Sequence, residues 1–257
     1  MSLLSPRNRL PRSGMRLTME GTRREHDDRR AHGSMFIPWR TGLPVRHNGH
    51  MTRHILWDLG GTLIDSYPQI DRMLQAYVTQ CGGTISVDDV AHLTRHSIAF
   101  AITALAERFS IPPDDLQEAY TLLKRAWEVS PPPVMDGAHD ILEQVHSKGG
   151  LNLVITNRDR ESARVLLNAS GLKVDDLICA PDGYARKPDP DMYITMMRRH
   201  DLNPSDCLAV GDRPIDAVAA QEAGIRCVLL ETPGIPLVAD AVAATRITGL
   251  AQLKSQL

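Results

Sequence analysis

The chain has 257 residues, of which 42% are hydrophobic and 23% are charged, a composition ordinary for a globular protein of one or two domains. The formal net charge is −2, but residues 1–50 contain ten Arg, no Lys and four acidic residues, so residues 51–257 carry about −8. An acidic body argues against nucleic-acid binding, and no apolar run approaches the roughly 18 residues of a membrane span. We therefore expect a protein that binds a cation and small anions, with no nucleic-acid or membrane partner and an oligomeric state that stays open.

Residues 1–50 lack apolar periodicity and are rich in Arg, Pro, Gly and Ser, so we predict a disordered extension. They have no apolar core of a secretory signal, and their acidic residues interrupt a transit-peptide pattern. Met51 lies three residues before the first predicted strand, which favours a natural start there or a dispensable tail. An Arg-rich arm for an anionic surface is the alternative.

The four cysteines show no metal-like spacing. Cys179, Cys207 and Cys227 fall in apolar, strand-like runs, so we predict buried free thiols. Such thiols fit the reducing cytoplasm.

Apolar runs alternate with amphipathic stretches from residue 51 onward. The predicted strands are 54–59, 151–156, 176–180, 207–211 and 225–230, and the predicted helices between them are 137–148, 159–170, 190–200 and 214–223. Near-continuous apolar strands separated by helices indicate a parallel sheet covered on both faces. Gly171 and Gly224 stand where glycines end helices.

Residues 67–134 interrupt this alternation. They predict helices near 68–81, 87–95, 97–109 and 113–129 and no strong strand, with Ser86 as an N-cap. The predicted fold class is therefore α/β, with a Rossmann-like core of a central parallel sheet formed by residues 51–66 and 135–257. An all-α domain of residues 67–134 is inserted after the first strand.

Asp58 stands at the carboxyl end of the first predicted strand, where ligands bind in open α/β sheets. Gly60 and Gly61 follow it and allow a sharp turn and close approach to a ligand, so that loop N–H groups can face phosphate oxygens. Taken alone, Asp58 can equally be a loop-capping residue.

Three further segments place polar residues after strands. Thr156 and Asn157 precede a helix, whose free N–H groups suit an anion, although either residue can be a plain N-cap. Lys187 is held by Pro188 before another helix and can neutralise a phosphate, or it is an ordinary surface Lys. Asp212 and Asp216 follow an apolar strand and suit Mg²⁺, or they are solvated loop acids.

Taken together, these segments resemble the four motifs of the haloacid dehalogenase-like (HAD) hydrolases in order, spacing and strand context. The resemblance covers residues 51–257 and extends to the inserted helical cap. Among the branches of the family, the chain looks most like the phosphoglycolate phosphatase-like and β-phosphoglucomutase-like members with this cap. One position departs from the family pattern: the phosphatases read Asp-x-Asp-Gly-Thr, and this chain reads Asp58-Leu-Gly60-Gly-Thr.

The resemblance implies an Mg²⁺-dependent phosphatase for a small phosphorylated substrate. Asp58 would attack phosphorus and form an aspartyl-phosphate. Thr156, Asn157 and Lys187 would hold the phosphoryl oxygens, with the backbone at Gly61 close to the substrate.

The same resemblance implies the metal ligands. Mg²⁺ would be bound by the Asp58 carboxylate, the backbone carbonyl of Gly60 and Asp212, while Asp216 would support the metal shell or orient Lys187.

Gly60 removes the side chain that serves as the family's general acid, and such a loss typically costs about 10²–10⁴ in rate. We therefore expect slow or selective hydrolysis that favours good leaving groups, unless a residue such as His92, Arg95 or His96 substitutes. The alternatives are a non-catalytic phosphometabolite-binding protein, or dehalogenase or phosphonatase chemistry. The last would need a Lys in the helical insertion, where only Lys124 occurs.

Overall fold

The computed structural model describes residues 52–232, 234–235 and 244–257. The predicted extension of residues 1–50 and the possible start at Met51 lie outside the described residues.

Six parallel strands form one sheet in the order β3-β2-β1-β4-β5-β6. Their bounds are β1 (His54–Trp57), β2 (Asn152–Thr156), β3 (Asp176–Cys179), β4 (Cys207–Gly211), β5 (Arg226–Leu230) and β6 (Thr245–Ile247). The five predicted strands are confirmed, whereas β6 was not predicted. Because β1 lies between β2 and β4, the strand order reverses beside it, and the carboxyl ends of these strands border a crevice where ligands bind.

The first strand is two residues shorter than predicted. The Leu59 carbonyl accepts hydrogen bonds from the N–H groups of Leu63 (3.0 Å) and Ile64 (2.9 Å). These bonds fold residues 59–64 into a tight loop, so the backbone leaves the sheet directly after Asp58.

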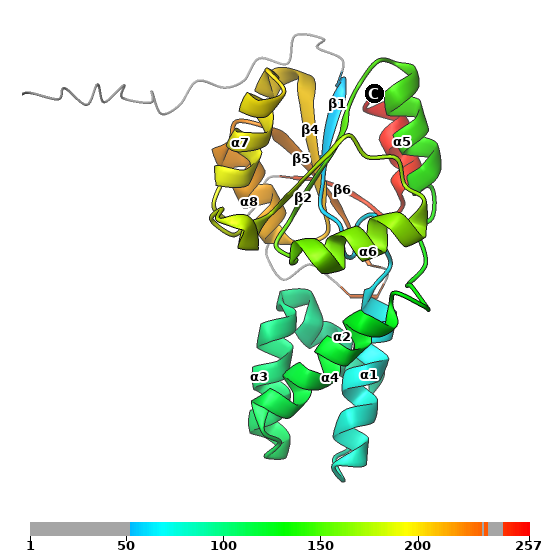
Figure 1. The fold of residues 1–257 in the computed structure, drawn as a ribbon, viewed down its shortest axis with the longest axis vertical. Helices are drawn as coiled ribbons and strands as arrows, with labels where there is room; N and C mark the ends of the chain where they lie inside the picture. The colour runs from blue at the N-terminus through cyan, green and yellow to red at the C-terminus, as the bar shows by residue number, and fades with distance from the viewer. Residues whose placement is uncertain (1–51, 233, 236–243) are drawn as a thin grey trace, which may run out of the picture. The chain divides into compact units, whose positions relative to one another are not determined.

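Helices cover both faces of the sheet (Figure 1). Alternate strand residues point to opposite faces: Ile55 and Trp57 pack with α5 (Ala138–Ser147) and α6 (Arg160–Ser170), whereas Leu56 packs with α7 (Asp191–Arg199) and α8 (Pro214–Glu222). Short 3₁₀ turns complete the layer at η1 (Ala180–Asp182), η2 (Pro204–Asp206) and η3 (Leu250–Ser255). The predicted parallel sheet with two covered faces is confirmed.

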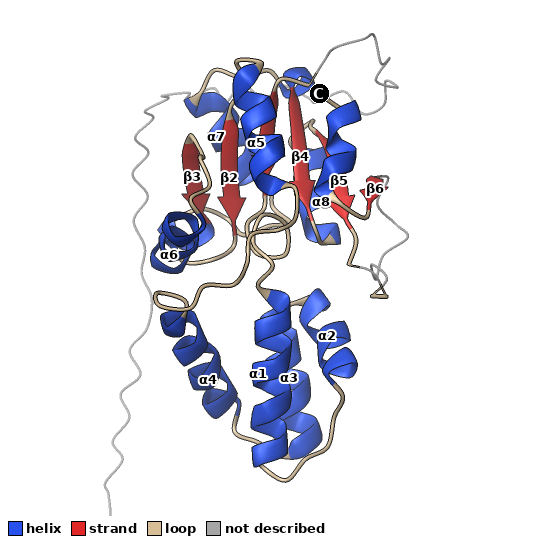
Figure 2. Ribbon diagram, turned by 90° about the vertical axis from the view of Figure 1, so that its right-hand side faces the viewer, coloured by secondary structure: helices blue, strands red, loops and turns tan. Residues whose placement is uncertain are grey.

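Residues 67–134, which we call the helical insert, contain four helices and no strand. Their bounds are α1 (Tyr67–Gln80), α2 (Val87–His96), α3 (Ile98–Phe109) and α4 (Pro113–Ala126). Leu74, Leu105 and Leu116 are completely buried between them. The strand arrows in Figure 2 point toward these helices, so the insert stands beyond the carboxyl ends of the strands.

Smaller sequence predictions are also confirmed. Ser86 caps α2 by accepting a hydrogen bond from the Asp89 N–H at 3.0 Å. Gly171 and Gly224 have positive φ at the ends of α6 and α8, and Cys179, Cys207 and Cys227 are buried free thiols.

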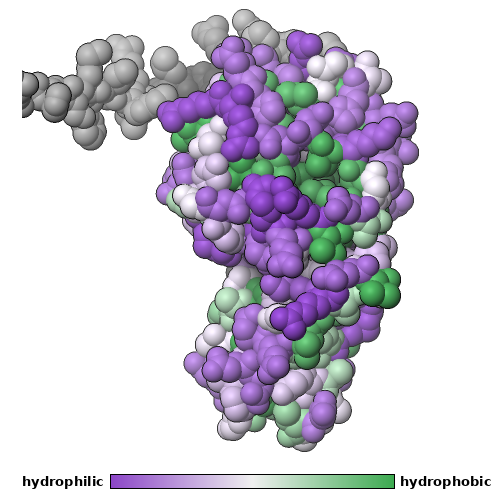
Figure 3. All heavy atoms as spheres, in the orientation of Figure 1, coloured by the Kyte–Doolittle hydropathy of each residue, from purple (hydrophilic) through white to green (hydrophobic). Residues whose placement is uncertain are grey.

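The polarity of the surface and the length of the helices agree with the ordinary hydrophobic content of the chain. The face drawn in Figure 3 is mostly hydrophilic, with apolar side chains in limited patches. No helix in the described part of the chain is both long and apolar enough to cross a lipid bilayer.

Candidate active site

The predicted site residues come together at the carboxyl edge of the sheet. Asp58 follows β1, Thr156 ends β2 and Asp212 follows β4, while Lys187 lies in the loop between β3 and α7. Asp58, Lys187 and Asp212 are 2%, 4% and 3% exposed, and Asp216 is completely buried. Four ionisable groups therefore share one buried place, which requires each charge to have a partner.

Lys187 joins two of these carboxylates. Its Nζ lies 2.5 Å from Asp58 Oδ1 and 2.5 Å from Asp216 Oδ1, and it donates a third bond to the Ile155 carbonyl at 3.0 Å. Burial lowers the pKa of Lys187, but the carboxylates of Asp216 and Asp58 outweigh it and raise the pKa above the usual value. Lys187 is therefore an ammonium fixed between two acids, and the interpretation of an ordinary surface Lys is wrong.

Asp216 has both oxygens engaged. Besides the ion pair to Lys187 through Oδ1, its Oδ2 accepts a hydrogen bond from the Arg213 N–H at 3.1 Å, at the start of α8. A Cβ on Gly211 would lie only 2.4 Å from the Asp216 Cβ, so the glycine permits this close approach. Of the two predicted roles for Asp216, these contacts favour orienting Lys187.

Asp212 differs from Asp216 because one of its oxygens is unused. Oδ1 accepts from Thr62 Oγ1 at 3.3 Å, whereas Oδ2 is buried and makes no hydrogen bond of good geometry among the described residues. The Tyr67 side chain lies beside this carboxylate and favours its charged form. Burial raises the pKa of Asp212 to about 7, against the opposing effect of Arg213. Burial likewise raises the pKa of Asp58, opposed by Lys187. Burial therefore disfavours the charged forms of both carboxylates, and a bound cation would stabilise them.

The donors at this edge fit a hard cation such as Mg²⁺, which prefers oxygen ligands and keeps several waters. Within the described ranges, no group of three His, Cys, Asp or Glu side chains is arranged around a metal position. A cation here would therefore depend on two carboxylates, Asp58 and Asp212, completed by backbone oxygen and water.

Gly61 is required by the local backbone. Its φ is +93°, and a Cβ would lie 2.3 Å from Tyr67 Cε2 and 2.6 Å from Asp212 Oδ2. Its N–H donates to the Ile64 carbonyl at 2.8 Å. Gly61 thus brings the loop against Asp212, and its own N–H is already used within the loop.

Thr156 and Asn157 are not helix caps, because the N-cap of α6 is Asp159. Thr156 Oγ1 accepts from the Arg158 N–H at 3.2 Å. The Asn157 side chain accepts from the Lys187 N–H at 2.9 Å and donates to the Lys187 carbonyl at 3.2 Å. Asn157 therefore holds the backbone of Lys187, although the two residues are 30 positions apart.

A cavity of about 650 Å³ opens above these residues. The insert contributes His96, Gln117, Tyr120 and Lys124 to its lining, and the α/β layer contributes Asp58, Gly60, Thr156, Asn157 and Lys187. The basic side chains that line it are Lys124, Arg158, Arg186, Lys187 and Arg213, whereas its acidic ones are Asp58 and Asp159. Positive charge in excess suits an anionic ligand.

The lining includes residues that the sequence did not single out. Arg158 directly follows Thr156 and Asn157, so the same strand-end position could have indicated it. Tyr67 reaches the cavity from the insert, and no sequence pattern marks it. Lys124, the one Lys that the sequence places in the insert, also lines the cavity. Among the three candidate replacement acids, His96 lines the cavity, while Arg95 is buried and paired with Asp71 at 3.5 Å.

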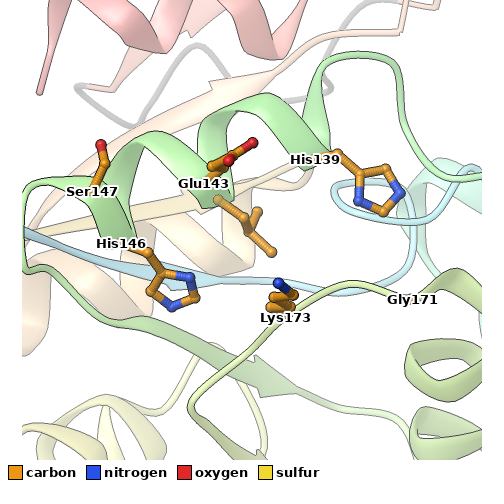
Figure 4. Close-up of a pocket in the computed structure, with 7 residues that line it drawn as sticks. His139, Glu143, His146, Ser147, Gly171 and Lys173 are labelled. Atoms are coloured by element: carbon orange, nitrogen blue, oxygen red, sulfur yellow. The ribbon is translucent and has the colours of Figure 1, made fainter.

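A second hollow of about 550 Å³ shares no residue with this cavity. Figure 4 shows His139, Glu143 and His146 along α5, facing Gly171 and Lys173 from the segment after α6. The His146 ring lies 2.8 Å from an Asp175 oxygen. None of the predicted site residues lies in this hollow.

Comparison with known proteins gives one consistent result. A family model described as haloacid dehalogenase-like hydrolase matches residues 52–224. The chain is 28% identical over 201 residues to the phosphoglycolate phosphatase of Pseudomonas fluorescens strain Pf0-1, covering 73% of this chain and 72% of that protein. It is 30% identical over 183 residues to the N-acetylmuramic acid 6-phosphate phosphatase of Pseudomonas putida strain KT2440, covering 68% of this chain and 80% of that protein.

Solved structures agree on the fold. The structure of a HAD family hydrolase from Deinococcus radiodurans R1 with bound phosphate and sodium superposes with a TM-score of 0.68. The sequence identity is 22%, and the match covers 80% of this chain and 95% of that one.

Proposed function

Because this chain belongs to the haloacid dehalogenase-like hydrolase family, we propose that it is a phosphatase that hydrolyses a small phosphorylated metabolite through a covalent intermediate on Asp58. The observation that carries this proposal is the buried Asp58 carboxylate, 2.5 Å from the Lys187 ammonium, at the base of a cavity lined by basic side chains. The curated relatives named above are phosphatases, which supports the same reaction class.

In the proposed reaction, Asp58 is the nucleophile. Lys187 binds Asp58 Oδ1, which leaves Oδ2 to form the bond to phosphorus while the bond from phosphorus to the leaving oxygen breaks. Water then attacks the aspartyl-phosphate, releasing inorganic phosphate and restoring the carboxylate. Lys187 balances negative charge on the phosphoryl oxygens, and Thr156 lies where it can donate to them.

Positioning of Lys187 is the proposed task of two other residues. Asn157 holds its backbone through two hydrogen bonds, and Asp216 holds its ammonium. A fixed charge needs no reorganisation during the reaction, which is the main source of electrostatic stabilisation in such sites.

Mg²⁺ is the proposed cofactor, held by Asp58, the Gly60 carbonyl and Asp212. When bound, it supplies charge neutralisation to the transferring phosphoryl group. The unpartnered Oδ2 of Asp212 supports this assignment.

Substrate selection is proposed to come from the helical insert, acting as a cap over the α/β layer. Its side chains His96, Gln117, Tyr120 and Lys124 line the cavity opposite Asp58. Because Gly60 supplies no acid, hydrolysis of simple alkyl phosphates should be slow, by about 10²–10⁴ relative to a site with a general acid.

The test is Mg²⁺-dependent phosphate release by the full chain from a panel of sugar phosphates, 2-phosphoglycolate and acetyl phosphate. Asp58→Asn should abolish phosphate release, and it should also abolish the phosphorylated protein that rapid acid quenching traps in the parent chain. Asp140 is exposed, so Asp140→Asn should leave both measurements unchanged. If no substrate gives Asp58-dependent release, the phosphatase proposal fails. Stabilisation by phosphate esters without turnover would then favour a binding protein.

A further inference from the structure

Arg158 occupies a distinctive position in the cavity. It follows β2 in the short loop before α6, and its Nη1 donates to Ser162 Oγ at 3.1 Å. Its guanidinium carbon lies 5.0 Å from the centre of the Trp127 ring, which the insert contributes. These two contacts position the guanidinium, and the side chain lines the cavity together with Asp58 and Gly60.

The guanidinium lies directly beside the place where a side chain at position 60 would begin. A Cβ built on Gly60 would be 3.0 Å from Arg158 Nη2 and 3.2 Å from Ser66 Oγ. The backbone at Gly60 does not have the positive φ that demands glycine, unlike that at Gly61. The nearest atom is instead at the end of the Arg158 side chain. Any side chain introduced at position 60 would therefore contact the Arg158 guanidinium.

A guanidinium cannot do the work of a general acid, because it stays protonated at all ordinary pH values. It can, however, donate two parallel hydrogen bonds to a carboxylate or phosphate. Such a group stabilises a leaving group that departs as a stable anion. It gives little help to an alkoxide, which needs a proton.

Building on the proposed phosphatase function, we infer that Arg158 binds the leaving group and that the site is built for phosphoryl donors whose leaving group is an oxyanion. Acyl phosphates and phosphoric anhydrides have this chemistry. In the first step, the bond from Asp58 to phosphorus forms and the bond from phosphorus to the leaving oxygen breaks. The electron pair stays on the leaving carboxylate or phosphate, so no proton is transferred.

In the second step, water attacks the aspartyl-phosphate. The bond from phosphorus to Asp58 breaks, the carboxylate is restored, and the proton of the water leaves with inorganic phosphate or passes to solvent. The carboxylate or phosphate product of the first step is bound by Arg158 until it is released.

The experiment compares acetyl phosphate with ethyl phosphate, which match in size and differ in the leaving group. Each rate is corrected by the rate with Asp58→Asn, which removes spontaneous hydrolysis. Arg158→Ala should lower kcat for acetyl phosphate by about 100-fold and leave the slow ethyl phosphate reaction nearly unchanged, with partial rescue by Arg158→Lys. Arg164→Ala, an exposed Arg on α6, is the matched control and should alter neither rate.

A second pair of variants uses the coupling between positions 60 and 158. In Gly60→Asp the new carboxylate should pair with Arg158, so acetyl phosphate hydrolysis should fall and ethyl phosphate hydrolysis should gain little. In the double variant Gly60→Asp with Arg158→Ala, the introduced carboxyl has no guanidinium to pair with and can act as a general acid. The substrate preference should then reverse, from acetyl phosphate to ethyl phosphate. A residue with a merely structural role would not reverse the preference, and circular dichroism would show that each variant is folded.

The outcomes separate the two proposals. Equal loss on both substrates in Arg158→Ala, or an unchanged ratio, overturns the leaving-group role while the Asp58 chemistry stands. A rise in KM confined to 2-phosphoglycolate would instead assign Arg158 to a distal carboxylate and also overturn it. Pyrophosphate, run in parallel, should show the same loss in Arg158→Ala, and an unchanged rate there overturns the inference for phosphate leaving groups. No Asp58-dependent release from any substrate defeats the proposed function itself, and this inference with it.

Discussion

The two walls of the cavity are built differently. On the α/β side, Asp58, Lys187 and Asp216 are buried and held to one another by ion pairs. On the insert side, His96 and Gln117 are exposed, and Lys124 is about one quarter exposed. One wall is fixed by buried ion pairs before any ligand arrives, whereas the side chains of the other wall are partly or fully exposed to solvent.

This difference separates reaction from recognition. A buried charge network tolerates little change, because removing one member leaves its partners unpaired in a desolvated place. Exposed side chains on helices can be replaced at small cost. We therefore expect variants of the α/β wall to lose activity and stability together, and variants of the insert wall to alter substrate affinity alone.

The largest effect should follow from Lys187→Met, which breaks the network at its centre. Asp58 and Asp216 would both lose their cation, and removing one partner of a buried pair costs about 3–5 kcal/mol. Phosphate release should fall by at least about 100-fold. Urea unfolding and initial rates measure the two effects, with the exposed Lys173→Met as the matched control. A variant as stable as the parent would show that the ion pairs at Lys187 contribute nothing to folding.

A smaller effect, on the stabilisation of the fold by Mg²⁺, should follow from Asp212→Asn, and it can be measured without an activity assay. In the parent chain, Mg²⁺ at 100 times its Kd should stabilise the fold by about 2.7 kcal/mol, because the free Oδ2 of Asp212 gains a partner. Asp212→Asn should remove most of this response, while Asp140→Asn should keep it. Thermal unfolding with and without Mg²⁺ is the measurement. An undiminished shift in Asp212→Asn would place the cation elsewhere.

The two walls also differ in what their sequence reveals. The five predicted strands are near-continuous apolar runs, and parallel strands align their carboxyl ends at one edge. Asp58, Thr156 and Asp212 could therefore be brought together from chain position alone. The third segment, at Lys187, followed from its order along the chain and its resemblance to a family motif.

Other features depend on contacts that no local pattern encodes. Asn157 was predicted to hold phosphoryl oxygens, and it lines the cavity. Its hydrogen bonds to the backbone of Lys187 were not predicted, because tertiary packing sets that pairing. Arg158 fills the space beside Gly60 only because the loops after β1 and β2 are neighbours. The edge strand β6 escaped prediction because it has three residues, of which Thr245 and Arg246 are exposed and give no apolar run.

The smallest effect should come from the insert wall, at Lys124. Its Nζ lies 2.9 Å from Asp159 Oδ2, with side chains 23% and 42% exposed, and a partly exposed pair of this kind contributes about 1 kcal/mol or less. Lys124→Gln should therefore leave stability nearly unchanged and raise KM a few-fold through the loss of one positive charge facing the substrate, with kcat preserved. Asp159→Asn keeps a good N-cap for α6, so a double-mutant cycle isolates the pair. A fall in kcat with unchanged KM would show that Lys124 acts in catalysis and not in substrate binding, and it would contradict the proposed difference between the two walls.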